Sequence, residues 1–165
     1  MKINKYEEAM FGAGCFWGVQ YHFNKIPGVI KTETGYSGGK TKNPSYEEVC
    51  SDKTSHAEVV HILFDSRKVS YEKLLEIFWR IHDPTTPNMQ WPDVGSQYRS
   101  AIFYFNDKQK IIAMNSKKEI QKIIKRKVVT EIKKAKTFYR AEDYHQDYIK
   151  EHGFNSCHIA SNPWL

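Results

Sequence analysis

Near the start of this chain, a short apolar run passes through a glycine turn directly into a helical pattern. The apolar run covers residues 9–12, and Gly-Ala-Gly at residues 12–14 forms the turn. From Cys15 onward the apolar side chains keep helical spacing until Pro27-Gly28 ends the pattern. We therefore predict a strand, a tight turn and a helix that begins at Cys15, packed on one face of a sheet.

The rest of the chain alternates between strand-like and helix-like patterns. Further strands are predicted at residues 29–36, 58–65, 101–105 and 128–132. Further helices are predicted at residues 71–81, capped by Ser70, from Asp107 as cap to about residue 126, and at 141–151. Residues 40–55 and 83–99 are predicted loops. The pattern favours an α+β two-layer sandwich, ferredoxin-like, with a mixed or antiparallel sheet and an irregular tail at about 153–165.

Length and charge set limits on the class of protein. A chain of 165 residues, of which 40% are hydrophobic, is long enough for one core and short for two, so we predict a single domain over residues 1–165. The first ten residues carry four charges and no later run reaches membrane-spanning length, which favours a soluble cytoplasmic protein. The net charge of +6 concentrates in residues 108–136, which we interpret as a solvated helix face rather than a nucleic-acid site.

The chain has three cysteines, at positions 15, 50 and 157, which form neither an even disulfide set nor a Cys-x-x-Cys metal pair. A helix that begins at Cys15 would direct backbone N–H groups at its sulfur, favouring the thiolate and lowering a pKa that is about 8.5 in a free cysteine. Flanking glycines would leave the sulfur accessible, and Phe16 and Trp17 would form an apolar wall for a substrate. The alternatives are a small buried cysteine and two ordinary core aromatics.

The motif Gly-Cys-Phe-Trp-Gly at residues 14–18, after a short strand, resembles the signature of the methionine sulfoxide reductase A family. Further blocks that resemble this family follow in order at residues 34–39 (TGYSGG), 46–50 (YEEVC), 56–60 (HAEVV), 82–85 (HDPT), 93–100 (DVGSQYRS) and 141–148 (AEDYHQDY). The resemblance covers roughly residues 11–157. So many collinear blocks make chance similarity a poor explanation.

The resemblance implies that the Cys15 thiolate attacks a sulfoxide sulfur, with Glu58 as the acid, Tyr36 and Tyr98 as phenol donors and Asp93 as a loop carboxylate. Sulfoxide oxygen leaves poorly unless it is protonated, so the acid must keep its proton near neutral pH. Glu58 shares a strand face with large apolar residues, and desolvation there would raise the pKa of its carboxyl. The two hydroxyls would stabilise charge on the oxygen. Without the motif, Glu58 would be read as a surface residue and Asp93 as a turn cap.

The resemblance also implies what happens after oxygen transfer. Cys157, in the irregular tail, would condense with a Cys15 sulfenic acid to a disulfide that thioredoxin or another dithiol reduces, with no bound cofactor or metal. The family's usual Gly-Tyr-Cys reads Asn-Ser-Cys here, so this match is partial. Cys50 is interpreted as a buried structural thiol. We interpret His145 as a residue that contacts and orients the catalytic groups without touching the substrate. The alternative is a purely structural histidine.

The substrate implied is the S epimer of methionine sulfoxide, free or in oxidised proteins, reduced by a monomeric repair enzyme. Two other functions remain open from the residues alone. One is a cysteine hydrolase, which needs a histidine base that the spacing does not single out. The other is a basic nucleic-acid-binding module. The lysine run argues against it, because a stacking surface needs aromatic residues interleaved with the lysines and this run has none. Two departures from the family pattern are Gln20, where Glu is frequent, and Trp91, which would reshape a pocket wall.

Overall fold

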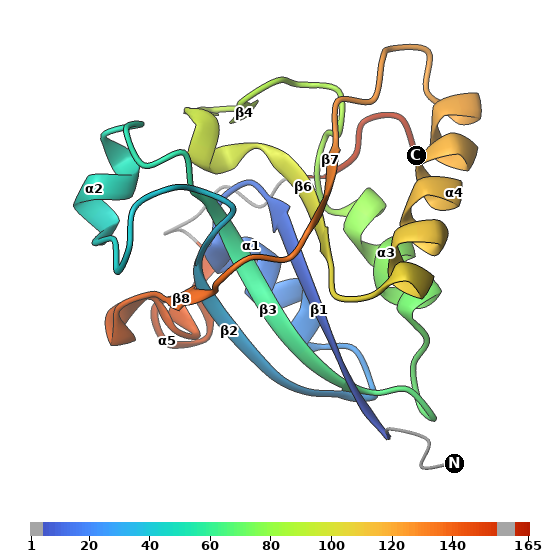
Figure 1. Ribbon diagram of the computed structural model, residues 1–165, viewed down its shortest axis with the longest axis horizontal. Coiled ribbons are helices and arrows are strands. Elements are labelled where there is room, and N and C mark those ends of the chain that lie inside the picture. Colours follow the sequence, from blue (N-terminus) through green and yellow to red (C-terminus); the bar gives the residue numbers. More distant parts are fainter. Residues whose placement is uncertain (1–4, 155–160) are drawn as a thin grey trace.

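The computed structural model describes residues 5–154 and 161–165, so Cys157 lies outside the described residues. Within them, six strands form one mixed sheet in the order β7-β6-β1-β3-β2-β8. Its strands are β1 (Tyr6–Ala13), β2 (Val29–Ser37), β3 (Ala57–Asp65), β6 (Ser100–Tyr104), β7 (Glu131–Lys134) and β8 (Tyr139–Arg140). Neighbouring strands are antiparallel except β6 and β7, which are parallel. The sheet runs through the middle of the molecule in Figure 1.

The predicted strand, turn and helix at the start of the chain are confirmed. β1 leads through Gly14 to α1 (Phe16–Asn24), and Cys15 is the N-cap residue. Gly14 has φ 90°, and a Cβ there would meet the Gln90 side chain at 2.8 Å. The turn thus requires glycine for both its backbone conformation and its space.

Helices cover one face of the sheet, where most of the core lies. Phe11 of β1 packs against Phe23 of α1 and Phe78 of α3 (Tyr71–Arg80), with ring centroids 5.5 and 5.1 Å from Phe11. Ser70 caps α3 as predicted, because its Oγ accepts a hydrogen bond of 3.1 Å from the Lys73 N–H. Figure 1 places α1 behind the strands and α3 beside α4 (Asp107–Ile123) at one side.

The opposite face of the sheet carries a smaller apolar cluster. Met10, Val59 and Phe103 are buried there, and Phe138, from the segment between β7 and β8, packs over them. Because side chains alternate along a strand, Glu58 points to the other side, with Val60 and Ile62 of the helix-covered core. The prediction that Glu58 shares a face with large apolar side chains is confirmed.

The α+β prediction, with a mixed sheet and packed helices, is confirmed, whereas the finer ferredoxin-like label stays a prediction. Several boundaries were wrong. Asn106, not Asp107, caps α4, because its Oδ1 accepts from the Gln109 N–H at 2.9 Å, and the helix ends at Ile123. The strand predicted at 128–132 begins later, at Glu131, since the Val129 N–H donates to the Pro84 carbonyl and not to β6.

The structure differs from the prediction in two loops and one helix. The 40–55 loop contains a short helix, α2 (Tyr46–Cys50), and the 83–99 loop contains the hairpin β4 (Met89–Gln90) and β5 (Asp93–Val94) before the 3₁₀ turn η1 (Ser96–Tyr98). The helix predicted at 141–151 is broken into η2 (Asp143–His145) and α5 (Tyr148–His152). The break lies at Asp147, whose φ of 53° is left-handed and incompatible with a continuous helix.

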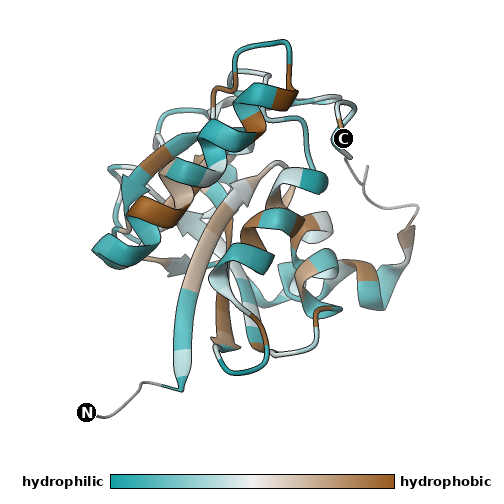
Figure 2. Ribbon diagram, turned by 90° about the vertical axis from the view of Figure 1, so that its right-hand side faces the viewer, coloured by the Kyte–Doolittle hydropathy of each residue, from teal (hydrophilic) through white to brown (hydrophobic). Residues whose placement is uncertain are grey.

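Most lysines of α4 are exposed, as predicted for a solvated helix, whereas Lys117 is half-buried and its ammonium donates to the Thr130 carbonyl at 2.8 Å. Lys110, Lys118 and Lys122 are exposed, while Gln109 and Ala113 face the core. In Figure 2 most of this helix is coloured hydrophilic, with hydrophobic residues interspersed. Across the described ranges, no helix has the length and apolar character needed to cross a membrane.

Candidate active site

The candidate nucleophile lies where the sequence predicted it. Cys15 is half-buried and immediately precedes α1, so the first backbone N–H groups of that helix surround its position. One of these groups, the Phe16 N–H, donates to Glu58 Oε1 at 3.3 Å. The Glu58 carboxyl therefore lies at the same helix terminus as the Cys15 thiol. The positive end of the helix dipole acts on both groups.

Glu58 is buried in β3, with 2% of its surface exposed. In the sheet register it lies directly opposite Tyr36 of β2. Burial disfavours the charged carboxylate, whereas the Phe16 N–H bond and the helix terminus favour it.

Tyr98 is the last residue of η1 and is the candidate site residue with a phenol in the 83–99 loop. Its pKa is raised above the ordinary range, first by burial and then by the charges of Glu58, Asp93, Cys50 and Cys15. The charges of Glu58, Asp93 and Cys15 thus all act on the Tyr98 phenol, and a shared catalytic role for these residues stays a prediction.

Tyr36 is fully buried, and its hydroxyl donates to Glu142 Oε1 at 3.1 Å. Its pKa is raised beyond the ordinary range, first by burial and next by Glu142. A phenol has a single hydrogen, so in this arrangement Tyr36 is not free to donate to another oxygen. The sequence interpretation missed Glu142, although it lies within the 141–148 block.

Phe16 and Trp17 have different environments. Phe16 is 1% exposed and packs between Tyr36 and His145, with ring centroids 5.7 and 5.1 Å away. Trp17 is half-buried and stacks on Tyr148 at 3.8 Å with an interplanar angle of 8°. Of the two predicted wall residues, only Trp17 offers appreciable exposed surface.

His145 lies behind these aromatics, in η2 rather than in a helix. Its Nδ1 accepts the Trp17 Nε1–H at 2.9 Å, and burial lowers its pKa. A neutral ring that accepts at Nδ1 carries its proton on Nε2. His145 thus fixes the indole of Trp17.

Cys50 is exposed on α2, so its interpretation as a buried thiol was wrong. The Tyr46 side chain hydrogen-bonds its thiol. The pKa of Cys50 is raised, first by desolvation and then by the charges of Glu58 and Glu142, against the lowering effect of the Tyr46 bond. Cys50 therefore remains a neutral thiol at neutral pH.

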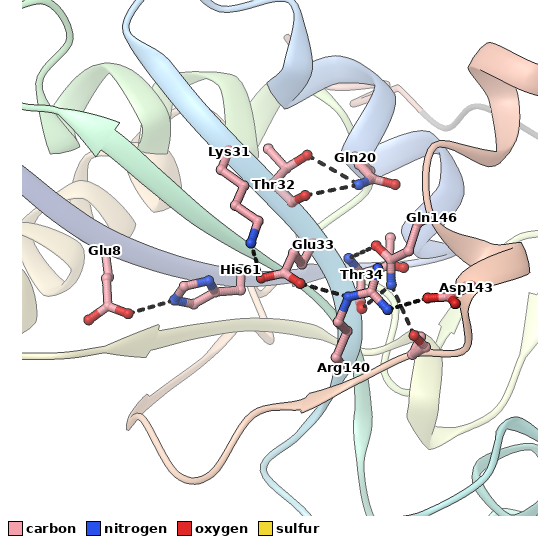
Figure 3. Close-up of polar contacts among 11 residues, drawn as sticks. Glu8, Gln20, Lys31, Thr32, Glu33, Thr34, His61, Arg140, Asp143 and Gln146 are labelled. Carbon is pink, nitrogen blue, oxygen red and sulfur yellow. Dashed lines mark hydrogen bonds and ion pairs between the residues drawn. The ribbon is translucent and has the colours of Figure 1, made fainter.

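A second layer of polar contacts fastens residues 139–147 to β2 (Figure 3). Arg140 bonds Glu33 at 2.7 Å, and Gln146 bonds the backbone of Thr34 from both ends of its amide. Gln20 of α1 bonds Thr32 and accepts the Asp147 N–H at 2.8 Å. These contacts fix the backbone of the segment that carries Glu142 and His145.

Asp93 and Trp91 belong to the 83–99 loop that also carries Tyr98. Asp93 is half-buried in β5, and Trp91 is 78% exposed, so its indole projects into solvent. In the part of the chain that the structure describes, no group of three or more His, Cys, Asp or Glu side chains is arranged to hold a metal ion.

A cysteine at a helix N-terminus, near a buried carboxyl and two phenols on an α+β sheet, suits a thiol-dependent oxidoreductase. The family model for peptide methionine sulfoxide reductase matches residues 7–165. The chain belongs to the peptide methionine sulfoxide reductase family.

Relatives and solved structures agree. Peptide methionine sulfoxide reductase MsrA of Methanothermobacter thermautotrophicus is 49% identical over 161 residues, covering 96% of this chain and 95% of the relative. MsrA of Methanosarcina acetivorans is 53% identical over 150 residues, covering 90% and 80%. The crystal structure of Mxr1 from Saccharomyces cerevisiae in reduced form is similar with a TM-score of 0.88 at 31% identity, covering 97% and 95%.

Proposed function

We propose that this enzyme reduces methionine S-sulfoxide, free or in oxidised proteins, by moving the sulfoxide oxygen to Cys15. The observation that carries the proposal is the Phe16 N–H bond to Glu58, which sets an acid beside the nucleophile at one helix terminus. The helix terminus favours the thiolate, and burial favours the acid. The reaction needs these two opposite protonation states together.

In the first step the Cys15 sulfur attacks the sulfoxide sulfur while Glu58 delivers a proton to the sulfoxide oxygen. A bond between the two sulfurs forms as the sulfur–oxygen bond of the substrate breaks. The released oxygen then bonds to the Cys15 sulfur while the sulfur–sulfur bond breaks, which leaves Cys15 as a sulfenic acid. Cys15 loses two electrons, the substrate sulfur gains them, and methionine leaves.

Tyr98 is the proposed donor to the oxygen as negative charge builds on it, and the charge of Asp93 acts on the Tyr98 phenol. Tyr36 joins as a second donor only when its hydroxyl turns away from Glu142. Trp17, fixed by His145, is the apolar surface for the substrate methyl group.

In the second step the Cys157 thiol attacks the sulfenic sulfur, water leaves and a Cys15–Cys157 disulfide forms. Thioredoxin is the proposed reductant, by exchange at that disulfide. A solved relative, Mxr1 from Saccharomyces cerevisiae, 26% identical, was crystallised in complex with Trx2. We further propose a single catalytic domain, a cytoplasmic monomer that needs no bound cofactor and acts in protein repair.

The test is turnover of peptides that carry the separate S and R epimers, with dithiothreitol as reductant. We expect reduction of the S epimer, abolished by Cys15→Ser and slowed about 100-fold or more by Glu58→Gln. Cys50→Ser, the matched control, should keep turnover. Preference for the R epimer, or activity in Cys15→Ser, would refute the proposal.

The resolving step needs a separate arm with thioredoxin as the only reductant. Cys157→Ser should still release one methionine per protein and then stop. Undiminished thioredoxin-dependent recycling in this variant would show that Cys157 is not the resolving residue.

A further inference from the structure

Glu142 is a half-buried carboxylate near the proposed active site that has no role in the mechanism above. It precedes η2, in the segment that returns along β2. The backbone on both sides is fixed, because the Ala141 N–H donates to the Thr34 carbonyl at 2.9 Å and the His145 N–H donates to the Glu142 carbonyl at 3.0 Å. The position of the Glu142 side chain is therefore set by the sheet.

Each carboxylate oxygen of Glu142 accepts a hydrogen bond from a different element. Oε1 accepts the Tyr36 hydroxyl of β2 at 3.1 Å, and Oε2 accepts the Tyr46 N–H at the start of α2 at 3.2 Å. Glu142 thus joins β2 to α2 through its two carboxylate oxygens.

Glu58 lies on the other side of Tyr36. It is directly opposite Tyr36 in the register, and the charges of Glu58 and Glu142 both act on the Tyr36 phenol and on the Cys50 thiol. Since the Tyr36 hydrogen points to Glu142, the lone pairs of that oxygen are left for other donors. The two carboxyls therefore share one neighbourhood, and two negative charges there would repel.

We propose that Glu142 is a positioning residue for sulfoxide reduction, which holds Tyr36 and the start of α2 in place and whose charge keeps Glu58 in its acid form. The inference rests on the proposed function. The Glu142 carboxylate is half-buried and has two hydrogen-bond donors, whereas Glu58 is buried at 2% exposure. Glu58 then retains the proton that the sulfoxide oxygen requires.

Other titratable groups share this region, and the pH dependence must be separated from theirs. They are Cys15 ahead of α1, Tyr46 and Cys50 of α2, Asp93 of β5, Tyr98 of η1, and Tyr144 and His145 of η2. The phenols keep their protons through the neutral range because burial raises the pKa of each. The Cys15 thiol sets the acid side of the rate profile, since its thiolate is the nucleophile. A fall in rate on the alkaline side reports loss of the acid.

The test is the pH profile of the single-turnover rate with an S-sulfoxide peptide. Glu142→Gln should move the alkaline limb to lower pH by about one unit, because it removes one negative charge near Glu58. Glu142→Asp, which keeps the charge, should restore most of the limb. Asp143→Asn, a neighbouring carboxylate paired with Arg140 outside the site, should leave the profile unchanged.

A second variant covers the case in which Glu142→Gln does not fold. Tyr36→Phe keeps the ring but removes the hydroxyl between the two carboxyls, and it should move the limb in the same direction by a smaller amount. An unmoved limb in the folded variants would overturn the inference. Wild-type protein without S-sulfoxide turnover would instead overturn the proposed function, so the two failures are distinguishable.

Discussion

At the scale of single residues, the proposed mechanism requires a thiolate and a protonated acid at one helix terminus. Cys15 precedes α1, and the Phe16 N–H of that helix donates to Glu58. In the proposed mechanism the helix terminus stabilises the Cys15 thiolate, and the burial of Glu58 favours its protonated form. Neither effect alone would suffice, because a thiol without the helix stays protonated and an exposed glutamate is ionised at neutral pH.

His82 provides a residue-scale prediction about stability. It is fully buried, with Nδ1 2.7 Å from the Phe78 carbonyl and Nε2 2.7 Å from Ser100 Oγ. Burial lowers its pKa to about 4, although the Phe78 bond and the Asp83 charge oppose this. Below about pH 6.5 the unfolded chain takes up a proton that the folded protein refuses until about pH 4, so stability falls as the pH falls through this window.

We expect the free energy of unfolding in urea to drop by about 2 to 3 kcal/mol from this histidine between about pH 7 and about pH 4.5. His82→Gln should show a shallower decline by that amount, because glutamine does not titrate. Parallel declines in the two proteins would contradict the assignment to His82.

Residue-level prediction from sequence worked where a local pattern carried the signal. The position of Cys15 at a helix start follows from a strand, a glycine turn and a helical pattern, and the apolar face that Glu58 shares follows from alternation along one strand. The catalytic role of Glu58 was implied only by the family resemblance. Glu142 had no such signal, since its partner Tyr36 is 106 residues away in sequence and the bond exists only through the register of the sheet. Cys50 was assigned to the core because Val49 is apolar, yet the turn of α2 directs it outward.

At the scale of elements, the last part of the chain is shaped by contacts with α1 and β2. Gln20 is 1% exposed, and its amide bonds Thr32 and the Asp147 N–H. Asn24 bonds the Asp147 carboxylate at 2.9 Å. These contacts hold the left-handed backbone at Asp147 that breaks the helix predicted at residues 141–151.

Gln20→Ala should lower the free energy of unfolding by about 2 kcal/mol, because it leaves the Asp147 N–H without its acceptor in a partly buried place. Urea denaturation measures the loss. Asn115→Ala, an exposed polar-to-alanine change on α4, should shift stability by no more than about 0.5 kcal/mol. Equal effects of the two changes would mean that Gln20 does not tie α1 to this segment.

Element boundaries were predicted well where periodicity was long and poorly where tertiary contacts decide. α3 has a strong apolar stripe and a serine cap, and it formed as predicted. α2 is only five residues long, too short to show periodicity. At its start Ser45 and Glu48 hydrogen-bond each other in a turn that resembles a capping box. The β4–β5 hairpin has two-residue strands that no pattern could indicate.

At the scale of the whole molecule, distant segments meet at one end of the sheet. Cys15 comes from the start of the chain, Tyr36 and Glu58 from paired central strands, Tyr98 from the loop, and Glu142 from the last third. The fold class was predictable from the mixture of patterns. The strand order was not, because pairing of β8 with β2 and of β7 with β6 depends on contacts over more than 25 residues.

The most direct test of this account counts the oxygen atoms that Cys15 receives. Cys157→Ser protein is mixed with excess S-sulfoxide peptide without a reductant, and both methionine and sulfenic acid are measured, the latter trapped with dimedone and located by mass spectrometry. We predict one methionine per protein and one adduct, on Cys15. Methionine formed without an adduct on Cys15, or an adduct confined to Cys50, would contradict the account.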